Sequence, residues 1–244
     1  TLAERKAKKI DAIIKSARLE ETAANMDRQM EGALEQAMKL NLSDKQKEAL
    51  MKIKEKVSGD LYLEELRKNF SESFTEKELS DLNDFYNDPM ISDVQEKASH
   101  YQTPEGQQEL MQVAQNFDPS SISPERLEAL KAHEKDSPEK EHALKNMSKI
   151  VMASLALSQG AGSGSKLSEE RKEVFEKSMR ENFDKISLAM KNEFFKDADV
   201  EKIHEHKRKI SENEVVKKQQ EMTLGMSDRM TDKLVKIFNE LGNK

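Results

Sequence analysis

Apolar residues recur along most of the chain at the three- and four-residue spacing of an α-helix. The first stripe consists of Ile10, Ile13, Ile14 and Ala17, and a second consists of Met26, Met30, Ala33, Leu34, Ala37 and Met38. Residues at these spacings share one helix face. The pattern therefore predicts one long helix over residues 3–40, or two helices with a break. No run alternates Val, Ile or Thr between turn residues, so strands are not expected.

Capping residues mark where further helices begin. Thr75 and Glu78 form a capping box, in which the Thr side chain accepts from a backbone amide and the Glu side chain reaches back. Ser211 and Glu214 form a second candidate box, and Ser43 is a candidate N-cap. An N-cap precedes a first-turn proline at Thr103-Pro104, Ser123-Pro124 and Ser137-Pro138. Together these signals predict an all-α fold.

Parts of the first half of the chain recur in the second half. Asn25-Met26 recurs as Asn146-Met147, and Glu4-Arg5 recurs as Glu125-Arg126, both at an offset of 121 residues (146 minus 25). At the same offset, Leu34, Phe74, Leu79, Leu82 and Val94 correspond to Leu155, Phe195, Val200, Ile203 and Val215. Such self-similarity indicates duplication of one helical unit. We predict two tandem, bundle-like copies of about 120 residues each, over residues 1–119 and 120–244.

A Gly- and Ser-rich stretch lies inside the second predicted copy. Its composition predicts a flexible loop over residues 159–166. The stretch lacks both the preceding strand and the Lys-Ser/Thr ending of a phosphate-binding loop. We therefore interpret it as a linker.

Composition limits the class of protein. The 244 residues include no Cys and no Trp, with 36% charged and 35% hydrophobic residues, which favours thin helical layers over a thick core. The net charge is −6, with acids and bases interleaved, and this argues against a nucleic-acid partner. No apolar run approaches the roughly 20 residues of a membrane span, so no transmembrane segment is expected.

Two segments carry a resemblance to a known family. Phe74-Thr75-Glu76-Lys77-Glu78-Leu79 is followed by Asp84-Phe85-Tyr86 and Pro89. Over about residues 40–115 this order resembles the bacterial domain-of-unknown-function family numbered 2059, with a diverged second copy. That family shows a Phe-Thr-x-x-Glu-Leu helix start and then a Phe-Tyr-x-Ser/Thr-Pro-x-Gly box. Here Ile91 occupies the glycine position, and a full Tyr-x-Thr-Pro-x-Gly pattern occurs only at residues 101–106. Either segment can therefore correspond to the box.

The resemblance implies a small helical protein, exported to the periplasm or secreted, with no assigned activity. The lack of Cys fits that location and fits many cytosolic proteins nearly as well. The chain begins at Thr1 rather than Met. Removal of a signal peptide and truncation of a longer chain are both compatible with this start.

Two groups of residues are candidates for ligand or partner binding. In the first, Phe85, Tyr86 and Tyr101 either staple adjacent helices or form a binding box. Since His206-Lys207 stands where Phe85-Tyr86 would fall in the second copy, we expect the first copy to do any binding by the box. The run from His206 to Lys209 is interpreted as a solvated helix face.

The second group consists of methionines that recur every four residues near the C-terminus, at Met222, Met226 and Met230. Such a row forms either adaptable core packing or a groove for an apolar partner. A Cu(I) site is a third and weaker interpretation. We expect these side chains to line a groove between the two copies.

Metal and catalytic chemistry receive little support. Glu139-x-x-His142 and Glu201-x-x-His204 have the spacing of di-iron ligands, but two such pairs are unremarkable by chance in a chain with five His and many Glu. We therefore assign no metal, no cofactor and no catalytic residue. No Gly-x-Ser-x-Gly motif or Cys nucleophile is present.

These observations favour a non-enzymatic, exported helical protein with an apolar groove between helices. Its partner would be a protein or an apolar ligand. An envelope or lipid-surface protein is the first alternative, although no helix has a Lys/Arg-rich face opposite Trp and Phe. An enzyme of unknown class is the second.

Overall fold

A computed structural model describes residues 1–158 and 169–242 of the chain, and within these ranges every regular element is helical. The all-α prediction is confirmed. The loop predicted at 159–166 lies outside the described residues. The helices are α1 (Leu2–Ser16), α2 (Leu19–Met38), α3 (Asp44–Lys56), α4 (Gly59–Ser73), α5 (Glu76–Asn87), α6 (Pro89–Tyr101), α7 (Pro104–Asn116), the 3-10 turn η1 (Pro119–Ser121), α8 (Pro124–Glu134), α9 (Pro138–Ser158), α10 (Glu169–Phe194), α11 (Val200–Ser211) and α12 (Glu214–Gly242).

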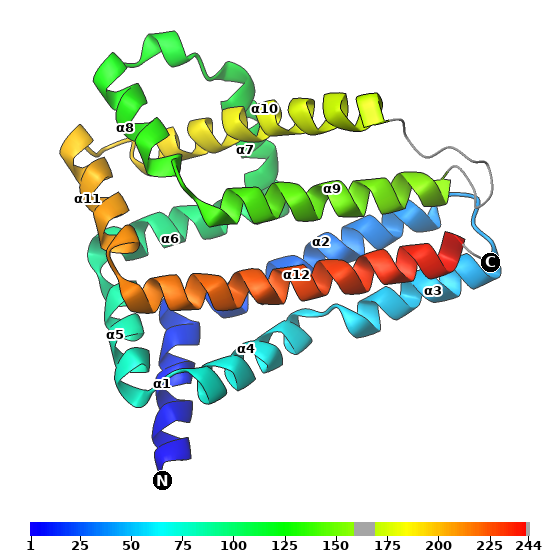
Figure 1. The fold of residues 1–244 in the computed structure, drawn as a ribbon, viewed down its shortest axis with the longest axis horizontal. Coiled ribbons are helices and arrows are strands. Elements are labelled where there is room, and N and C mark those ends of the chain that lie inside the picture. Colours follow the sequence, from blue (N-terminus) through cyan, green and yellow to red (C-terminus); the bar gives the residue numbers. More distant parts are fainter. Residues whose placement is uncertain (159–168, 243–244) are drawn as a thin grey trace.

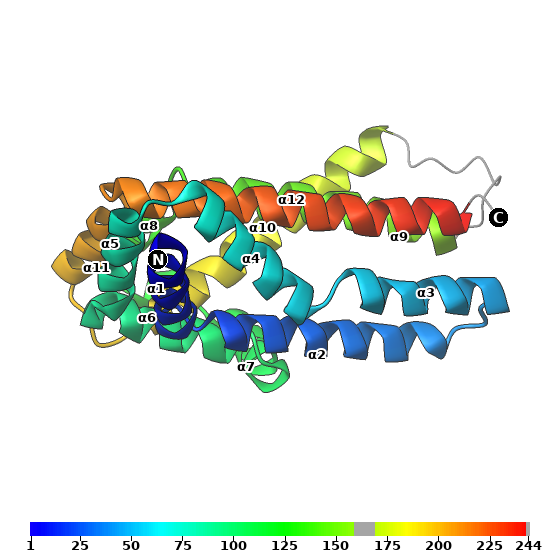
Figure 2. The same ribbon diagram turned by 90° about the horizontal axis from the view of Figure 1, so that it is seen from below.

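The long helices form two layers. α9 and α12 pack side by side along the molecule (Figure 1). In the view from below, α2 and α3 form a hairpin beneath this pair (Figure 2). The end of the molecule opposite the hairpin tip contains α1, α5 and α11. At this end α1 packs on α5, and α11 packs on both α8 and α12. α10 packs on α6, α7, α8 and α9.

The apolar stripe over residues 3–40 forms two helices, α1 and α2. The break falls at Arg18, whose φ of 56° is left-handed and therefore cannot continue a right-handed helix. Of the two alternatives that the sequence left open, the broken helix is the correct one.

Most predicted caps are present. Thr75 and Glu78 make both bonds of the capping box, and the Ser43 hydroxyl accepts from the backbone amide of Gln46. The box predicted at Ser211 is wrong, because α11 continues through Ser211. The side chain of Asn213 instead accepts from the first amides of α12, at Val215 and Val216. Asn is at least as favourable an N-cap as Ser, so the chain caps α12 two residues later.

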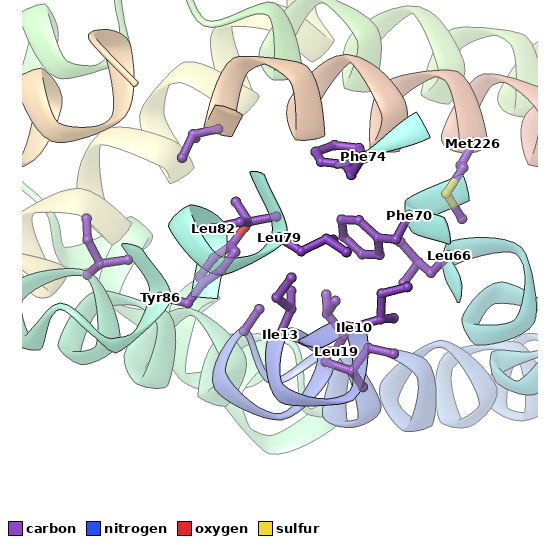
Figure 3. Packing of buried hydrophobic residues seen from close by; sticks show 14 residues of the cluster. Ile10, Ile13, Leu19, Leu66, Phe70, Phe74, Leu79, Leu82, Tyr86 and Met226 are labelled. Carbon is purple, nitrogen blue, oxygen red and sulfur yellow. The ribbon is translucent and has the colours of Figure 1, made fainter. Parts of the chain in front are cut away.

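The largest core cluster lies between α1, α4, α5 and α12 (Figure 3). Phe70 and Phe74 meet edge to face with ring centroids 5.2 Å apart, and both are almost fully buried. Met226 reaches this cluster from α12. Residues from both predicted halves therefore share one core.

A related cluster contains side chains of α8, α10, α11 and α6. In it α11 packs on α8, as α5 packs on α1 in the first cluster. Asp88 and Lys209, which are separated by the offset of 121 residues, form an ion pair. A difference is that α3 and α4 are two helices, whereas α10 is continuous. The duplication and the boundary at residues 119–120 remain predictions.

Gly106 allows the close turn between α6 and α7. A Cβ at this position would overlap the backbone carbonyl of His100. We expect Gly106→Ala to lower the free energy of unfolding by about 1–3 kcal/mol, because backbone rather than a side chain must move. Gly32→Ala is the matched control: its Cβ would meet nothing within 4 Å in the interior of α2.

Gly32→Ala should instead stabilise the protein by up to about 1 kcal/mol, the difference in helix propensity. Urea unfolding of both variants measures these changes. Equal effects of the two substitutions would contradict the proposed role of Gly106.

Candidate functional site

One cavity in the described part of the chain has a volume of about 830 Å³. It lies where α5 and α6 of the first half meet α10, α11, the first half of α12 and the α8–α9 connection. Apolar lining comes from Phe85, Val94, Ile210, Val216 and Leu224. Ionisable lining comes from four carboxylates, three lysines and three histidines: Asp136, Glu139, Glu221, Asp228, Lys191, Lys207, Lys217, His133, His142 and His206. The cavity therefore presents both an apolar and a charged surface.

A half-buried histidine, His133, and a buried one, His206, meet in the charged part of the lining. The Nε2 of His133 and the Nδ1 of His206 are 2.9 Å apart, so one ring donates to the other. Phe195 packs against both rings, with each centroid separation 5.1 Å. His206 is only 4% exposed. The Nδ1 of His133 is buried and has no hydrogen-bond partner among the described residues.

This burial opposes protonation of the pair. Loss of solvation, aided by nearby Lys191, lowers the pKa of His133 to about 2 and that of His206 to about 4. Both rings are therefore neutral at physiological pH. A neutral imidazole offers one donor and one acceptor, so this surface recognises polar groups without adding charge.

Lys191 is a half-buried cation of the site. Its side chain is 14% exposed, and its Nζ lies 3.7 Å from Oε1 of Glu134, which is longer than a hydrogen bond. Glu134 also accepts a hydrogen bond from the Ser187 hydroxyl. Loss of solvation lowers the pKa of Lys191 to about 8, against the opposing attraction of Glu134.

Arg126 at the start of α8 holds the turn that precedes α11. Its guanidinium donates to the side chain of Asn192 at 3.0 Å and to the carbonyls of Phe195 and Ala198 at 2.7 and 2.9 Å. These bonds satisfy carbonyls at the end of α10. They fix Phe195, and with it the packing around the histidine pair.

Two of the predicted aromatic residues line the cavity. Tyr86 is buried, and its hydroxyl donates to Oε1 of Gln219 at 2.5 Å. Burial raises the pKa of Tyr86, so the phenol stays protonated. Phe85 packs edge to face on Tyr86. Tyr101 lies elsewhere, where it packs against His100 and Phe194 at the α6–α7 corner.

None of the predicted methionines is among the residues that line this cavity. Met226 is 2% exposed and belongs to the core cluster of Figure 3, against which Met222 also packs. Met230 packs against the cluster formed by α3 and the end of α12. Met226 and Met230 also line a separate cavity of about 270 Å³ with Tyr62. Met222 and Met226 therefore share a core cluster with Tyr86 and Phe85, whereas Met230 belongs to another cluster.

Sequence reasoning missed the residues of the second half that line the cavity. His206 was placed on a solvated face, and this is wrong because the helix turns it toward His133 and Phe195. One signal was available: His206-Lys207 stands at the offset of 121 residues from Phe85-Tyr86. Both pairs line the same cavity, so equivalent positions of the two predicted copies meet there.

The two Glu-x-x-His pairs do not converge. His142 pairs with Asp228 at 3.1 Å, and across residues 1–158 and 169–242 no group of three or more His, Asp or Glu is placed to hold a metal ion. None of the described helices combines the length and apolarity needed to cross a membrane. No protein-family model, curated protein or solved structure matches the chain at a significant level.

Proposed function

We propose that the protein is a binding protein that holds an apolar or amphipathic small molecule in the cavity between Phe85, Leu224 and Lys191. The observation that carries this proposal is the cavity itself, of about 830 Å³ and lined from both halves of the chain. Ligand pockets typically measure about 300–1,000 Å³ and combine apolar walls with a few fixed polar groups. The bonds of Tyr86 to Gln219 and of His133 to His206 provide such fixed groups.

A non-catalytic role is part of the proposal. The two histidines of the cavity are engaged with each other, and no described residue that lines it is placed as a nucleophile beside a base. We also propose an exported location. It is supported by the resemblance over residues 40–115 and by the lack of Cys, which removes the risk of unwanted disulfides in an oxidising compartment.

Binding of a neutral fluorescent probe tests the proposed function. We expect N-phenyl-1-naphthylamine to bind the wild-type protein with one saturable site. Leu224→Trp should weaken binding, because the larger indole takes up part of the cavity that Leu224 lines. Met111→Trp is the matched control, since Met111 is 50% exposed and lies outside the cavity.

Equal loss of binding in both variants, or no saturable binding by the wild-type protein, would contradict this function. The natural chain has no Trp, so each variant also carries a single indole that reports on its own environment. Indole emission that shifts on probe addition in the Leu224→Trp variant, and stays unchanged in the Met111→Trp variant, would locate any residual binding at the cavity.

One observation favours the alternative of a lipid-surface protein. The α2–α3 hairpin exposes three large apolar side chains. The exposed fractions are 40% for Met38, 62% for Leu40 and 50% for Met51. α3 also carries Lys45, Lys47, Lys52, Lys54 and Lys56 against three acidic residues. Exposed apolar groups beside excess lysine are the features that anionic lipid surfaces attract.

A liposome flotation experiment tests this alternative. If the hairpin binds lipid, the protein should float with vesicles that contain phosphatidylglycerol, and Leu40→Asp with Met51→Asp should abolish flotation. Met111→Asp controls for the loss of an exposed apolar residue elsewhere on the surface. Flotation that survives the double substitution would exclude the hairpin as the lipid-binding element.

A further inference from the structure

Lys191 stands where the first half of the chain has a core phenylalanine. At the offset of 121 residues, Lys191 corresponds to Phe70, and its ion-pair partner Glu134 corresponds to Ile13 (191 minus 70 and 134 minus 13). Phe70 and Ile13 are both 0% exposed and belong to the core cluster of Figure 3. Apolar residues in place of a buried ion pair are often neutral or stabilising. Packing at this position of the fold therefore does not require a lysine.

Three lysines line the cavity of about 830 Å³, and two of them have hydrogen-bond partners. The Nζ of Lys207 donates to two backbone carbonyls at 3.0 and 2.9 Å. Lys217 is 47% exposed and pairs with Glu214 at 3.1 Å. The Nζ of Lys191, by contrast, lies 3.7 Å from the Oε1 of Glu134, which is beyond hydrogen-bond distance. Lys191 is therefore the lysine of the lining whose nitrogen is least committed to the protein.

The surroundings of Lys191 favour the unprotonated amine, the form that attacks a carbonyl carbon. Its side chain is 14% exposed. Loss of solvation lowers its pKa to about 8, and Lys207 adds repulsion against the opposing attraction of Glu134. At pH 7.5 such a pKa leaves roughly a quarter of the amine unprotonated, against roughly one part in a thousand for an ordinary lysine. Desolvation beside a second cation is one way in which proteins activate a lysine nucleophile.

We propose that Lys191 binds an apolar aldehyde covalently, as a Schiff base at its Nζ, with the rest of the ligand against Phe85, Val94 and Leu224. This inference rests on the proposed function and names its ligand class. The nitrogen forms a double bond to the carbonyl carbon. One ammonium proton stays on the nitrogen, and the other two leave with the carbonyl oxygen as water. The positive charge on the nitrogen is kept, so Glu134 remains its counter-ion.

Reductive trapping with decanal tests this assignment on the wild-type protein. Sodium cyanoborohydride reduces an imine to a stable secondary amine, and peptide mass spectrometry then identifies the modified lysine. We expect Lys191 to be modified at least tenfold faster than Lys77 at pH 7.5. Lys77 is the internal control, because it is 84% exposed, pairs with Asp81 and lies outside the cavity. Excess N-phenyl-1-naphthylamine, which competes for the cavity, should slow modification of Lys191 and leave that of Lys77 unchanged.

Two variants complete the test. Lys191→Arg keeps the charge but cannot form an imine, so it should lose the rapid first adduct and bind the neutral probe within twofold of the wild-type protein. Lys77→Arg should keep the adduct at Lys191.

The outcomes separate the two proposals. Modification of Lys191 no faster than that of Lys77, or modification that the neutral probe does not slow, would overturn the Schiff-base assignment, while saturable probe binding would leave the proposed function standing. Failure of both the probe and decanal to bind would overturn both. The comparison of Lys191 with Lys77 needs no variant, so the test holds even if Lys191→Arg does not fold.

Discussion

Replacing Phe70 by alanine is expected to lower the free energy of unfolding by about 3–5 kcal/mol. Phe70 is 0% exposed, and its ring meets Phe74 at 5.2 Å within the cluster of α1, α4, α5 and α12. Truncation removes the buried apolar surface and leaves a cavity that rigid helices refill poorly. Urea unfolding followed by far-UV circular dichroism measures the change.

Met111→Ala serves as the control for this substitution. Met111 is 50% exposed, and its replacement should change stability by less than about 0.5 kcal/mol. Because Met226 and Val216 of α12 join this cluster, we also expect one cooperative transition for the whole chain. A loss below about 1 kcal/mol on Phe70→Ala, or two separate transitions, would contradict the shared core.

Acidification from pH 6.5 to 5 is expected to destabilise the protein by about 1–3 kcal/mol in total. Burial lowers the pKa of His133 to about 2 and of His206 to about 4, whereas both titrate near 6.5 in the unfolded chain. In this window the unfolded state binds protons that the folded state does not. Stability therefore falls as pH falls, and recovers toward pH 7.

Other groups with lowered pKa values act outside this window. At Asp88, burial raises the pKa, but the ion pair with Lys209 outweighs it and the pKa lies below the usual carboxyl range. At Asp228, the hydrogen bond with His142 lowers the pKa. The contribution of both carboxylates is lost only at lower pH. Lys191, with a pKa of about 8, affects the pH dependence only in the alkaline range. The slope between pH 5 and 6.5 therefore reports on the histidine pair.

A double variant, His133→Phe with His206→Phe, should remove most of this slope. His100→Gln is the control, because His100 lies on the surface and pairs with Glu109. Denaturant midpoints at several pH values, converted to free energies, give the measurement. An unchanged slope in the double variant would show that these histidines are not held neutral by burial.

Local signals in the sequence predicted the helices well. Ser43, Thr75 and Thr103 cap helices because a short side-chain oxygen next to a free amide acts without distant partners. The error at Ser211 arose from a competition between neighbours, in which Asn213 takes the cap. Periodicity likewise predicted the α1–α2 stripe but left its break open, because Arg18 carries no residue signature of a left-handed conformation.

The candidate site was only half predictable. Phe85 and Tyr86 were candidates because they precede a helix-starting proline and fall in the box of the resembled family. His206 lies among charged neighbours in the sequence, and Lys191 is a single lysine in a mostly apolar stretch. The burial of both depends on α8, α10 and α11 meeting in space. Periodicity along one helix cannot show which distant helix covers a given face. The methionine row shows the same limit, since Met226 and Met230 serve packing clusters on different helices.

Native mass spectrometry of the wild-type protein and the Leu224→Trp variant, purified in parallel from the natural host, tests the binding cavity most directly. We expect a co-purifying small molecule on the wild-type protein and less of it on the variant, since Leu224 lines the cavity and the larger indole takes up part of it. A bare wild-type protein that also fails to bind the neutral probe, or an adduct retained equally by Leu224→Trp, would contradict the account.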